Sequence, residues 1–388
     1  MPEQYDVIVV GLGAMGSAAI YHLTKRGQRA VGIDAFEEGH DKGSSHGHHR
    51  LIRRSHANPQ FQPLIDRAFE LWYALEGESG EKIMNLIGEV AMSSTAIPTS
   101  AGWSGGEVLD EQHLRERFRG FRLHPGMVAT YEREAGYLRP EVGVAAHLRL
   151  AERNGAVIRR PEEVTDWKVE GNGVRVTTTA GSYAADRLVV TVGPWAVEQL
   201  RVLGLPLQVV RIVNVYFRLE RPDLWTAECG APTFTLSVPE GEYYGMPSIA
   251  GQGLKLGCHD LGEHTTARTI RREISDDEVS HLRRVLDTYL PGAGGIAELG
   301  ITCMYSMTPD GIYIVERHPL HAQVVYACGF SGTGYKFSPV IGEILSDLVT
   351  GSATTFDTSM FASGRFADGA HTENPRQGDQ VTGESVLS

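Results

Sequence analysis

The hydrophobic pattern near the start of the chain predicts a strand, a helix and a second strand. Residues 7–10 form a continuous apolar run, as expected for a strand that is buried on both faces. Residues 17–25 show apolar positions at helical spacing, and residues 30–33 form a second short apolar run. Three glycines connect the first strand to the helix, and Asp34 directly follows the second strand. The pattern therefore predicts a βαβ unit.

The glycines and the acidic residue of this unit are typical of a dinucleotide-binding site. Gly11 allows the tight turn, Gly13 lets the backbone approach a pyrophosphate, and Gly16 lets the helix pack closely on the strand. The amino-terminal end of the helix favours a bound anion. Asp34 lies 18 residues after Gly16, where an acidic side chain can bind ribose hydroxyls. We favour a dinucleotide site over a purely structural glycine turn because strand, helix and acid are all present.

The later pattern favours FAD over a nicotinamide dinucleotide. A nicotinamide enzyme usually continues with regular βαβ units, whereas this chain enters a segment rich in Gly, Ser, His and Arg at 43–54. The elements expected after it are helices over 63–75, 144–153 and 339–348, a short strand at 157–158, a hairpin of 164–169 with 174–179, and a buried strand with a turn over 187–195. Such a return to the dinucleotide domain after a long excursion is typical of FAD-binding proteins, because FAD is bulky and needs contacts from distant segments.

Composition and charge argue against several classes of protein. The length of 388 residues allows two structural domains with an ample core. The first strand begins near Tyr5, which leaves little room for a signal peptide, and no stretch approaches the roughly 18 apolar residues of a membrane span. The four cysteines suggest no disulfide framework, and a net charge of −12 disfavours nucleic acid. We expect a cytoplasmic protein with no membrane or nucleic-acid partner and a disordered polar tail at 366–388.

Six motifs occur along the chain. They are the glycine motif of 11–16, Ser-His-Gly-x-x-Arg-x-Ile-Arg at 45–53, Tyr-Tyr-Gly-x-Pro-Ser at 243–248, Gly-Leu-Lys-Leu-Gly-Cys-His at 253–259, Cys-Met-Tyr at 303–305 and Gly-Phe-Ser-Gly-x-Gly-Tyr-Lys-Phe at 329–337. In this order they resemble the monomeric sarcosine oxidase and N-methyl amino acid oxidase family, within the D-amino-acid-oxidase-like flavoproteins. The resemblance covers about residues 4–365.

The resemblance implies an α/β fold with two domains. A Rossmann-like FAD-binding domain is expected from 1–88, 145–206 and 291–365. A substrate domain, expected to be a mostly antiparallel β-sheet inserted into the first, would comprise 89–144 and 207–290. The resemblance also suggests a monomer that needs no metal.

The resemblance further implies that FAD is attached covalently to Cys303 through an 8α-thioether. By itself, a lone cysteine is more often a small buried hydrophobic residue. The attachment needs a thiolate, which a neighbouring cation stabilises, and the resemblance places Arg50 close to the flavin. The other residues expected to contact FAD are Gly11, Gly13, Ala14, Met15, Gly16, Asp34, Ala35, Ser44, Val164, Gly193, Trp195, Gly329, Gly332, Gly334 and Lys336.

A second set of residues is implied to act on the substrate and on oxygen. Arg53 and Lys336 are expected to bind the substrate carboxylate, and a planar guanidinium suits this because it binds a carboxylate bidentately. Lys255 alternates with two leucines on an expected strand, so it faces away from them, toward water or a polar cavity. The resemblance places Lys255 beside the flavin as the site of oxygen activation. The residues expected to complete the site are Tyr244, His259 and Tyr305.

Without the resemblance, these residues allow simpler interpretations. Arg50 and Arg53 lie in a segment with few acidic sequence neighbours and could form a solvated basic cluster or contact phosphates. Lys255 and Lys336 could be ordinary surface lysines.

The implied activity is the oxidation of a secondary α-amino acid by oxygen, with sarcosine as the leading candidate. Sarcosine, oxygen and water would give glycine, formaldehyde and hydrogen peroxide by transfer of a hydride equivalent to the flavin. The alternatives are an oxidase of N-methyl-L-tryptophan, L-pipecolate or L-proline, a dehydrogenase of the same fold that uses another electron acceptor, and a non-enzymatic binding protein. Departures from the family pattern at His48, His49 and Thr333 leave the exact substrate open.

Overall fold

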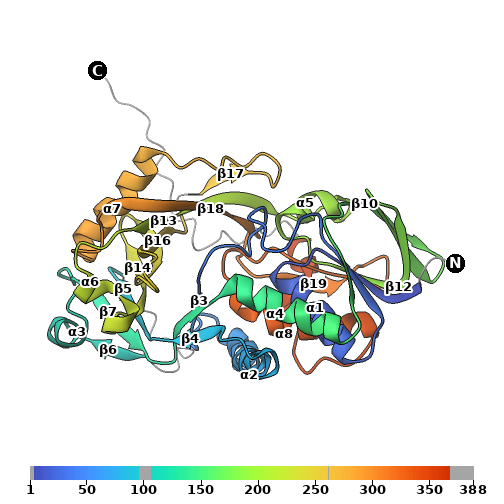
Figure 1. Ribbon diagram of the computed structural model, residues 1–388, viewed down its shortest axis with the longest axis horizontal. Coiled ribbons are helices and arrows are strands. Elements are labelled where there is room, and N and C mark those ends of the chain that lie inside the picture. The colour runs from blue at the N-terminus through green and yellow to red at the C-terminus, as the bar shows by residue number, and fades with distance from the viewer. Residues whose placement is uncertain (1–3, 96–105, 261, 368–388) are drawn as a thin grey trace, which may run out of the picture.

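Figure 1 shows a computed structural model in which two β-sheets occupy opposite halves of the molecule, with short strands between them. The structure describes residues 4–95, 106–260 and 262–367. Most of the expected tail, from residue 368 onward, lies outside the described residues. The α/β architecture with mixed sheets and helices is the predicted fold class.

The first sheet contains the predicted βαβ unit. Its strands are β1 (Gln4–Val10), β2 (Ala30–Ile33), β9 (Val157–Arg159), β10 (Val164–Glu170), β11 (Gly173–Thr178), β12 (Ser182–Val190), β19 (Ile314–Arg317) and β20 (Val324–Cys328). In the described part of the chain these eight strands run in the order β10-β11-β12-β1-β2-β9, with β20 beside β12 and β19 beside β20. β1 pairs in parallel with β2 and β12, so it lies inside the sheet and both of its faces are covered.

Helices cover one face of this sheet. The apolar core on the other face includes residues of the β10–β11 hairpin. Alternate residues of β1 divide between two cores: Val7 and Val9 pack against the helices, whereas Ile8 and Val10 pack with strand residues. The helices are α1 (Ala14–Lys25), α2 (Gln62–Ser79), α4 (Pro140–Arg153) and α8 (Ser338–Thr350). They confirm the helices predicted over 17–25, 63–75, 144–153 and 339–348.

The second sheet is mostly antiparallel, as predicted. Its strands are β5 (Glu89–Ser93), β6 (Glu107–Leu109), β7 (Val128–Glu132), β13 (Gln208–Phe217), β14 (Thr233–Val238), β15 (Gly241–Met246), β16 (Leu254–Cys258), β17 (Glu263–Thr265) and β18 (Ala297–Met307). Within the described residues these nine strands run in the order β17-β13-β16-β15-β14-β5-β7-β6, with β18 beside β13. Of the strand pairs described in this sheet, only β5 with β14 is parallel.

The two faces of the second sheet differ in chemistry. Phe217, Leu254 and Leu256 belong to an apolar core with α7 (Asp276–Tyr289). Residues between these positions, such as Lys255, face the opposite side because successive residues of a strand alternate. We call this opposite side the polar face; its members, which share it through the strand register, are Glu89, Glu132, Asn214, Tyr216, Thr235, Tyr244, Lys255, Cys303 and Tyr305.

Short strands lie between the two large sheets (Figure 1). They are β3 (Arg50–Ile52), β8 (Gly136–Leu138) and β4 (Met84–Leu86), and β8 pairs with both of the others. The remaining helices are α3 (Glu111–Arg117), α5 (Ala196–Gln199) and α6 (Pro222–Trp225). None of the helices in the described residues has the length and apolar character that a membrane span requires.

The pairing of β18 differs from the expected domain boundary at residue 291. Residues 297–307 were expected in the FAD-binding domain, but β18 pairs with β13 along that strand's whole length, from Gln208 opposite Met307 to Phe217 opposite Ala297. β18 therefore belongs to the second sheet. The reason is that the backbone N–H and C=O groups of β13 that do not pair with β16 or β17 need hydrogen-bond partners, and β18 supplies them.

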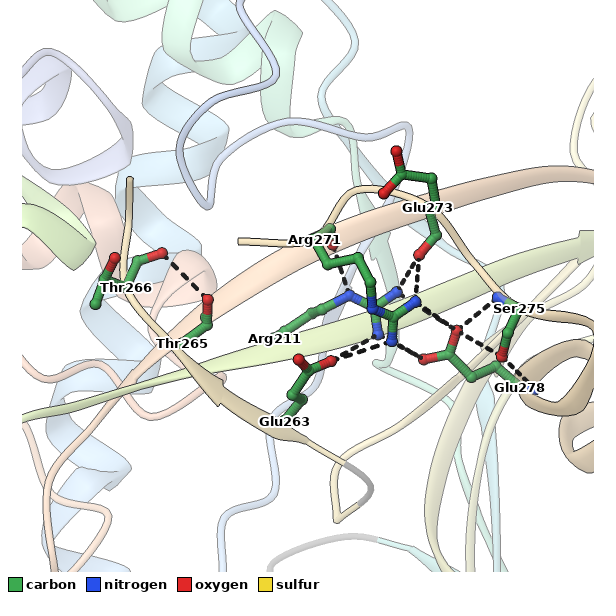
Figure 2. Close-up of polar contacts among 8 residues, drawn as sticks. All are labelled: Arg211, Glu263, Thr265, Thr266, Arg271, Glu273, Ser275 and Glu278. Carbon is green, nitrogen blue, oxygen red and sulfur yellow. Dashed lines mark hydrogen bonds and ion pairs between the residues drawn. The ribbon is translucent and has the colours of Figure 1, made fainter. Parts of the chain in front are cut away.

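A buried arginine on the apolar side of β13 secures the segment that leads into α7 (Figure 2). The side chain of Arg211 is 2% exposed, and its Nε donates to the carbonyl of Arg271 at 2.7 Å while Nη2 donates to the carbonyl of Glu273 at 2.6 Å. Its Nη1 donates to Glu278 Oε1 at 2.5 Å. Glu278 also forms a capping box with Ser275 at the start of α7.

This network makes fold stability depend on acid pH. Burial alone would raise the pKa of Glu278, but hydrogen bonds from Arg211, the Ser275 backbone and Arg271 lower it to about 2 from its ordinary value of 4.5. Because the pKa is lower in the folded state, the stabilisation is complete above pH 4.5 and is lost as the pH falls toward 2. We expect Glu278 to contribute up to about 3 kcal/mol of unfolding free energy that disappears over this range.

Urea denaturation of the Glu278→Gln variant should therefore show a weaker loss of stability on acidification than the wild type. Glu298→Gln is the control, because Glu298 on β18 forms an exposed ion pair with Arg218. An unchanged pH dependence in Glu278→Gln would contradict the account.

Candidate active site

A cavity of about 630 Å³ is lined by residues of both large sheets. It lies beyond the carboxyl ends of β1 and β2, where open α/β sheets bind their ligands. The expected cofactor residues that line it are Gly11, Gly13, Ala14, Met15, Asp34, Ala35, Ser44, Arg50, Val164, Gly193, Trp195, Cys303, Gly329, Gly332 and Gly334. Its volume lies within the range of about 300–1,000 Å³ that is usual for small-molecule sites.

The glycine motif shapes one wall of this cavity. Gly11 has φ of +84°, a conformation that L side chains rarely adopt. Gly16 is not among the lining residues, because it faces the turn itself: a Cβ atom there would lie 1.8 Å from the carbonyl oxygen of Gly11. Gly16 thus permits the close approach of α1 to the turn rather than offering a contact surface.

Asp34 ties the glycine turn to the end of β2. Its Oδ2 accepts a hydrogen bond from the backbone N–H of Leu12 at 2.7 Å, and its Oδ1 accepts one from Phe36 at 3.0 Å. Asp34 also lines the cavity. Each carboxylate oxygen can accept more than one hydrogen bond, so the side chain can hold the turn and still accept from a ligand hydroxyl.

Arg50 is fixed by the loop that precedes it. Its guanidinium donates to the carbonyls of Ser44 at 3.0 Å, His46 at 2.6 Å and His49 at 3.0 Å. Both Arg50 and Cys303 line the cavity, and the Cys303 thiol is buried with its Sγ 3.8 Å from the Ser44 carbonyl. The loop therefore presents a cation and a thiol to the same cavity.

Lys255 is a buried cation on the polar face. It is 3% exposed, and its Nζ donates to the carbonyl of His49 at 3.2 Å. Burial, together with the positive charge of Arg50, lowers the pKa of Lys255 to about 7, and Cys303 opposes this shift. Lys255 faces away from Leu254 and Leu256, as predicted, and it lines a small space together with Arg50 and Cys303. The interpretation of Lys255 as a solvated strand lysine is wrong.

The expected tyrosines and histidine form one hydrogen-bonded chain. The Tyr305 hydroxyl donates to the Tyr244 hydroxyl at 3.2 Å and lies 3.1 Å from His259 Nδ1, and Tyr244 donates to Asn214 Oδ1 at 2.8 Å. Burial raises the pKa of both tyrosines, so their hydroxyls stay protonated. Tyr305 also lines the cavity. The sequence did not indicate Asn214, because nothing in the pattern relates it to Tyr244.

Arg53 has a carboxylate partner that the sequence analysis missed. Its Nη1 donates to Oε1 of Glu89, the first residue of β5, at 2.7 Å. The expectation of few acidic neighbours therefore holds only along the sequence and is wrong in space, because the fold brings β5 beside residue 53. The alternation along β5 could have placed Glu89 on the face opposite Val90 and Met92. It could not have identified Arg53 as its partner.

Lys336 lies in a 3₁₀ turn, Tyr335–Phe337, that contacts β3. Its Nζ donates to the carbonyl of Thr333 at 3.3 Å and lies 5.0 Å from the ring centroid of Phe337. Lys336 is not among the residues that line the cavity. The contact of its turn with β3 brings it to the same region as Arg53, which directly follows that strand.

Comparison with known proteins identifies the family. A sequence model described as "FAD dependent oxidoreductase" matches residues 6–348. The chain belongs to this family. FAD is accordingly the cofactor that the cavity has to accommodate.

Similar proteins cover almost the whole of this FAD-dependent oxidoreductase. The monomeric sarcosine oxidase of Streptomyces avermitilis is 38% identical over 386 residues, which is 95% of this chain and 99% of that protein. The N-methyl-L-tryptophan oxidase of Salmonella heidelberg is 31% identical over 94% of this chain and 100% of its own length. The solved structure of NikD, an unusual amino acid oxidase essential for nikkomycin biosynthesis, has a TM-score of 0.81 and 24% identity over 93% of this chain and 97% of that one.

The residues of the cavity fit FAD. A glycine turn at the start of α1 and Asp34 suit the adenosine and pyrophosphate portion. Arg50 and Cys303, which come from the loop and from the second sheet, suit the isoalloxazine, which is electron-poor when oxidised and gains negative charge on reduction. The sites of Asp34 and Cys303 lie on different sheets, as an extended dinucleotide requires.

The burial of the Lys255 ammonium should lower the free energy of unfolding of this oxidoreductase relative to a variant with an uncharged side chain at this position. The pKa of Lys255 is about 7 in the folded state and 10.5 ordinarily, so stability rises with pH between these values, and the full cost is present below pH 7. We expect Lys255→Met to raise the unfolding free energy at neutral pH by up to about 5 kcal/mol. Urea denaturation of the holoenzyme would measure this, with the exposed Lys168→Met as control. A destabilised Lys255→Met protein would contradict the account.

Proposed function

We propose that this enzyme is an oxidase of secondary α-amino acids, N-methylated or cyclic, with sarcosine as the leading candidate. The observation that carries the proposal is a pair of cations beside Cys303: the partly buried Arg50 lines the cavity that suits a flavin, and the buried Lys255 lines a small space shared with Arg50 and Cys303. The names of the similar enzymes, sarcosine oxidase and N-methyl-L-tryptophan oxidase, support a substrate of this class. We also propose a cytoplasmic monomer.

We propose that Arg53 and Lys336 bind the substrate carboxylate. Arg53 uses one N–H group for Glu89, and its side chain is 35% exposed, so another edge of the guanidinium can bind a ligand. The chain of Tyr305, Tyr244 and His259 then lies on the polar face, where its hydroxyls and imidazole can orient the substrate amine. The amine must be unprotonated when the C–H bond breaks, because its lone pair stabilises the imine product.

We propose that Lys255 promotes the reaction with oxygen. When bound, FAD takes the electrons from the C–H bond beside nitrogen and passes them to O2, which leaves as hydrogen peroxide. A cation about 4 Å from an oxygen that gains negative charge stabilises it by up to about 4 kcal/mol at an effective dielectric constant near 20. Lys255 is buried and has no carboxylate partner among the described residues, so its charge is available for this purpose.

Peroxide production should therefore match substrate consumption one for one, with oxygen as the sole acceptor. A panel of sarcosine, N-methyl-L-tryptophan, L-pipecolate, L-proline and glycine would identify the substrate.

In stopped-flow experiments, Lys255→Met should slow reoxidation by O2 about a hundredfold or more, while reduction by substrate changes less. Because the pKa of Lys255 is about 7, reoxidation should weaken as the pH rises above 7 and the ammonium loses its proton.

The matched control for this experiment is Lys255→Arg, which keeps the positive charge. If the reduced wild-type enzyme transferred electrons to a quinone or a dye but not to oxygen, the enzyme would be a dehydrogenase. If Lys255→Met and the wild type were reoxidised at the same rate, the role of Lys255 would be refuted.

We propose that FAD is bound through the Cys303 sulfur. The Cys303 thiol and the cationic Arg50 line the same cavity, so the sulfur is placed where it can reach the cofactor. Acid precipitation of the wild type should leave the yellow colour with the protein, whereas Cys303→Ala should release it to the supernatant. Cys258→Ala is the matched control, because Cys258 is buried on the apolar face of the same sheet. Colour that stayed in the Cys303→Ala pellet would rule out this attachment site.

A further inference from the structure

Glu89 lies beneath the guanidinium that is proposed to bind the substrate carboxylate. It is 2% exposed, and its Oε1 accepts hydrogen bonds from Arg53 Nη1 at 2.7 Å and from Thr235 Oγ1 at 3.2 Å. Its Oε2 is buried and has no hydrogen-bond partner among the described residues. Glu89 thus places a full carboxylate, only half satisfied, beside Arg53.

Fold stability alone does not explain this carboxylate. Taking two charges out of water costs free energy that a buried ion pair regains only when the remaining lone pairs are also satisfied. The unpartnered Oε2 of Glu89 fails that condition. What Glu89 does contribute is a negative charge placed directly against Arg53.

The rest of the Arg53 side chain remains available. Within the described part of the chain, the bond to Glu89 is its one hydrogen bond, and its side chain is 35% exposed. A guanidinium has five N–H donors in a planar fork and can bind two carboxylates on different edges. Arg53 can therefore keep Glu89 on one edge and take a ligand carboxylate on another.

Two further carboxylates, Glu132 and Glu242, act on Arg53. Glu132 stands directly opposite Glu89 on β7, and its Oε1 accepts hydrogen bonds from the backbone N–H groups of Arg54 and Ser55. The carboxylate of Glu242, on β15, also acts electrostatically on Arg53. The charge of Arg53 is thus already partly balanced by Glu89, Glu132 and Glu242 before a ligand binds, so little positive charge remains there beyond what one ligand carboxylate neutralises.

We propose that Glu89 determines the charge of the ligand, so that the site favours amino acids with one carboxylate and discriminates against those with a second. The proposal rests on the proposed function, because it takes Arg53 and Lys336 as the carboxylate site. Glu89 limits the positive potential there, and a second anionic group on the ligand finds no cation to balance it. Acidic side chains are excluded by charge, whereas neutral and cationic ones are accepted.

Butyrate and succinate test the proposal as binding probes, because both have four carbons and they differ by one carboxylate. Each would be titrated into the oxidised holoenzyme at constant ionic strength, with the change in flavin absorption as the readout. The wild type should bind butyrate at least about tenfold more tightly than succinate. In Glu89→Gln the dissociation constant should fall about tenfold for butyrate and further for succinate, because two negative charges rather than one lose the repulsion of Glu89.

Two further variants separate charge from packing. Glu89→Asp keeps the negative charge and should keep the wild-type preference for butyrate, whereas Glu298→Gln removes an exposed carboxylate elsewhere on the sheet and should change nothing. If Glu89 merely held Arg53 in position, Glu89→Gln would weaken both ligands equally. That result, or a wild type that binds succinate as tightly as butyrate, would overturn the proposal.

Turnover gives an independent readout. The ratio of kcat/KM for N-methyl-L-alanine to that for N-methyl-L-aspartate should fall at least about tenfold in Glu89→Gln. An enzyme that oxidised neither compound nor any other N-alkyl amino acid would refute the proposed function. In that case the binding of butyrate and succinate would still show whether Glu89 selects ligands by charge.

Discussion

Two cations without carboxylate partners among the described residues, the partly buried Arg50 and the buried Lys255, constrain the whole site. Among the described residues, Arg50 and Lys255 form no ion pair, and their nitrogen atoms bond instead to backbone carbonyls of Ser44, His46 and His49. Burying a charge in this way is costly unless something compensates it. Carbonyl dipoles compensate in part, and they fix the conformation of the loop that precedes β3. A ligand that is electron-rich, or becomes so during the reaction, can supply the rest.

The second sheet is arranged to hold Lys255 beside Arg50 and Cys303, with which it lines a small space. Strand alternation sends Phe217, Leu254 and Leu256 into the apolar core with α7 and leaves Lys255 on the polar face. The buried network of Arg211 secures the apolar side, where it joins β13 to the start of α7. The polar face can therefore hold costly groups, because the packing that stabilises the sheet is on its other side.

Local patterns predicted the elements of the chain better than its long-range pairings. The βαβ unit, the helices α1, α2, α4 and α8, and the orientation of Lys255 followed from periodicity and spacing, whereas α7 was not predicted. The pairing of β18 with β13 and the ion pair of Arg53 with Glu89 join segments far apart in sequence, so no local pattern predicts them. The hydroxyl chain from Tyr305 to Asn214 was missed for the same reason.

The reduction potential of the bound flavin tests most directly whether the two cations act on the cofactor. A flavin that gains electrons beside Arg50 and Lys255 is stabilised by their positive charge, so its potential should be higher in the wild type than in either Arg50→Gln or Lys255→Gln. Anaerobic redox titration of the three proteins measures this difference. Equal potentials in all three would mean that these cations do not face the flavin, and the account of the site would fail.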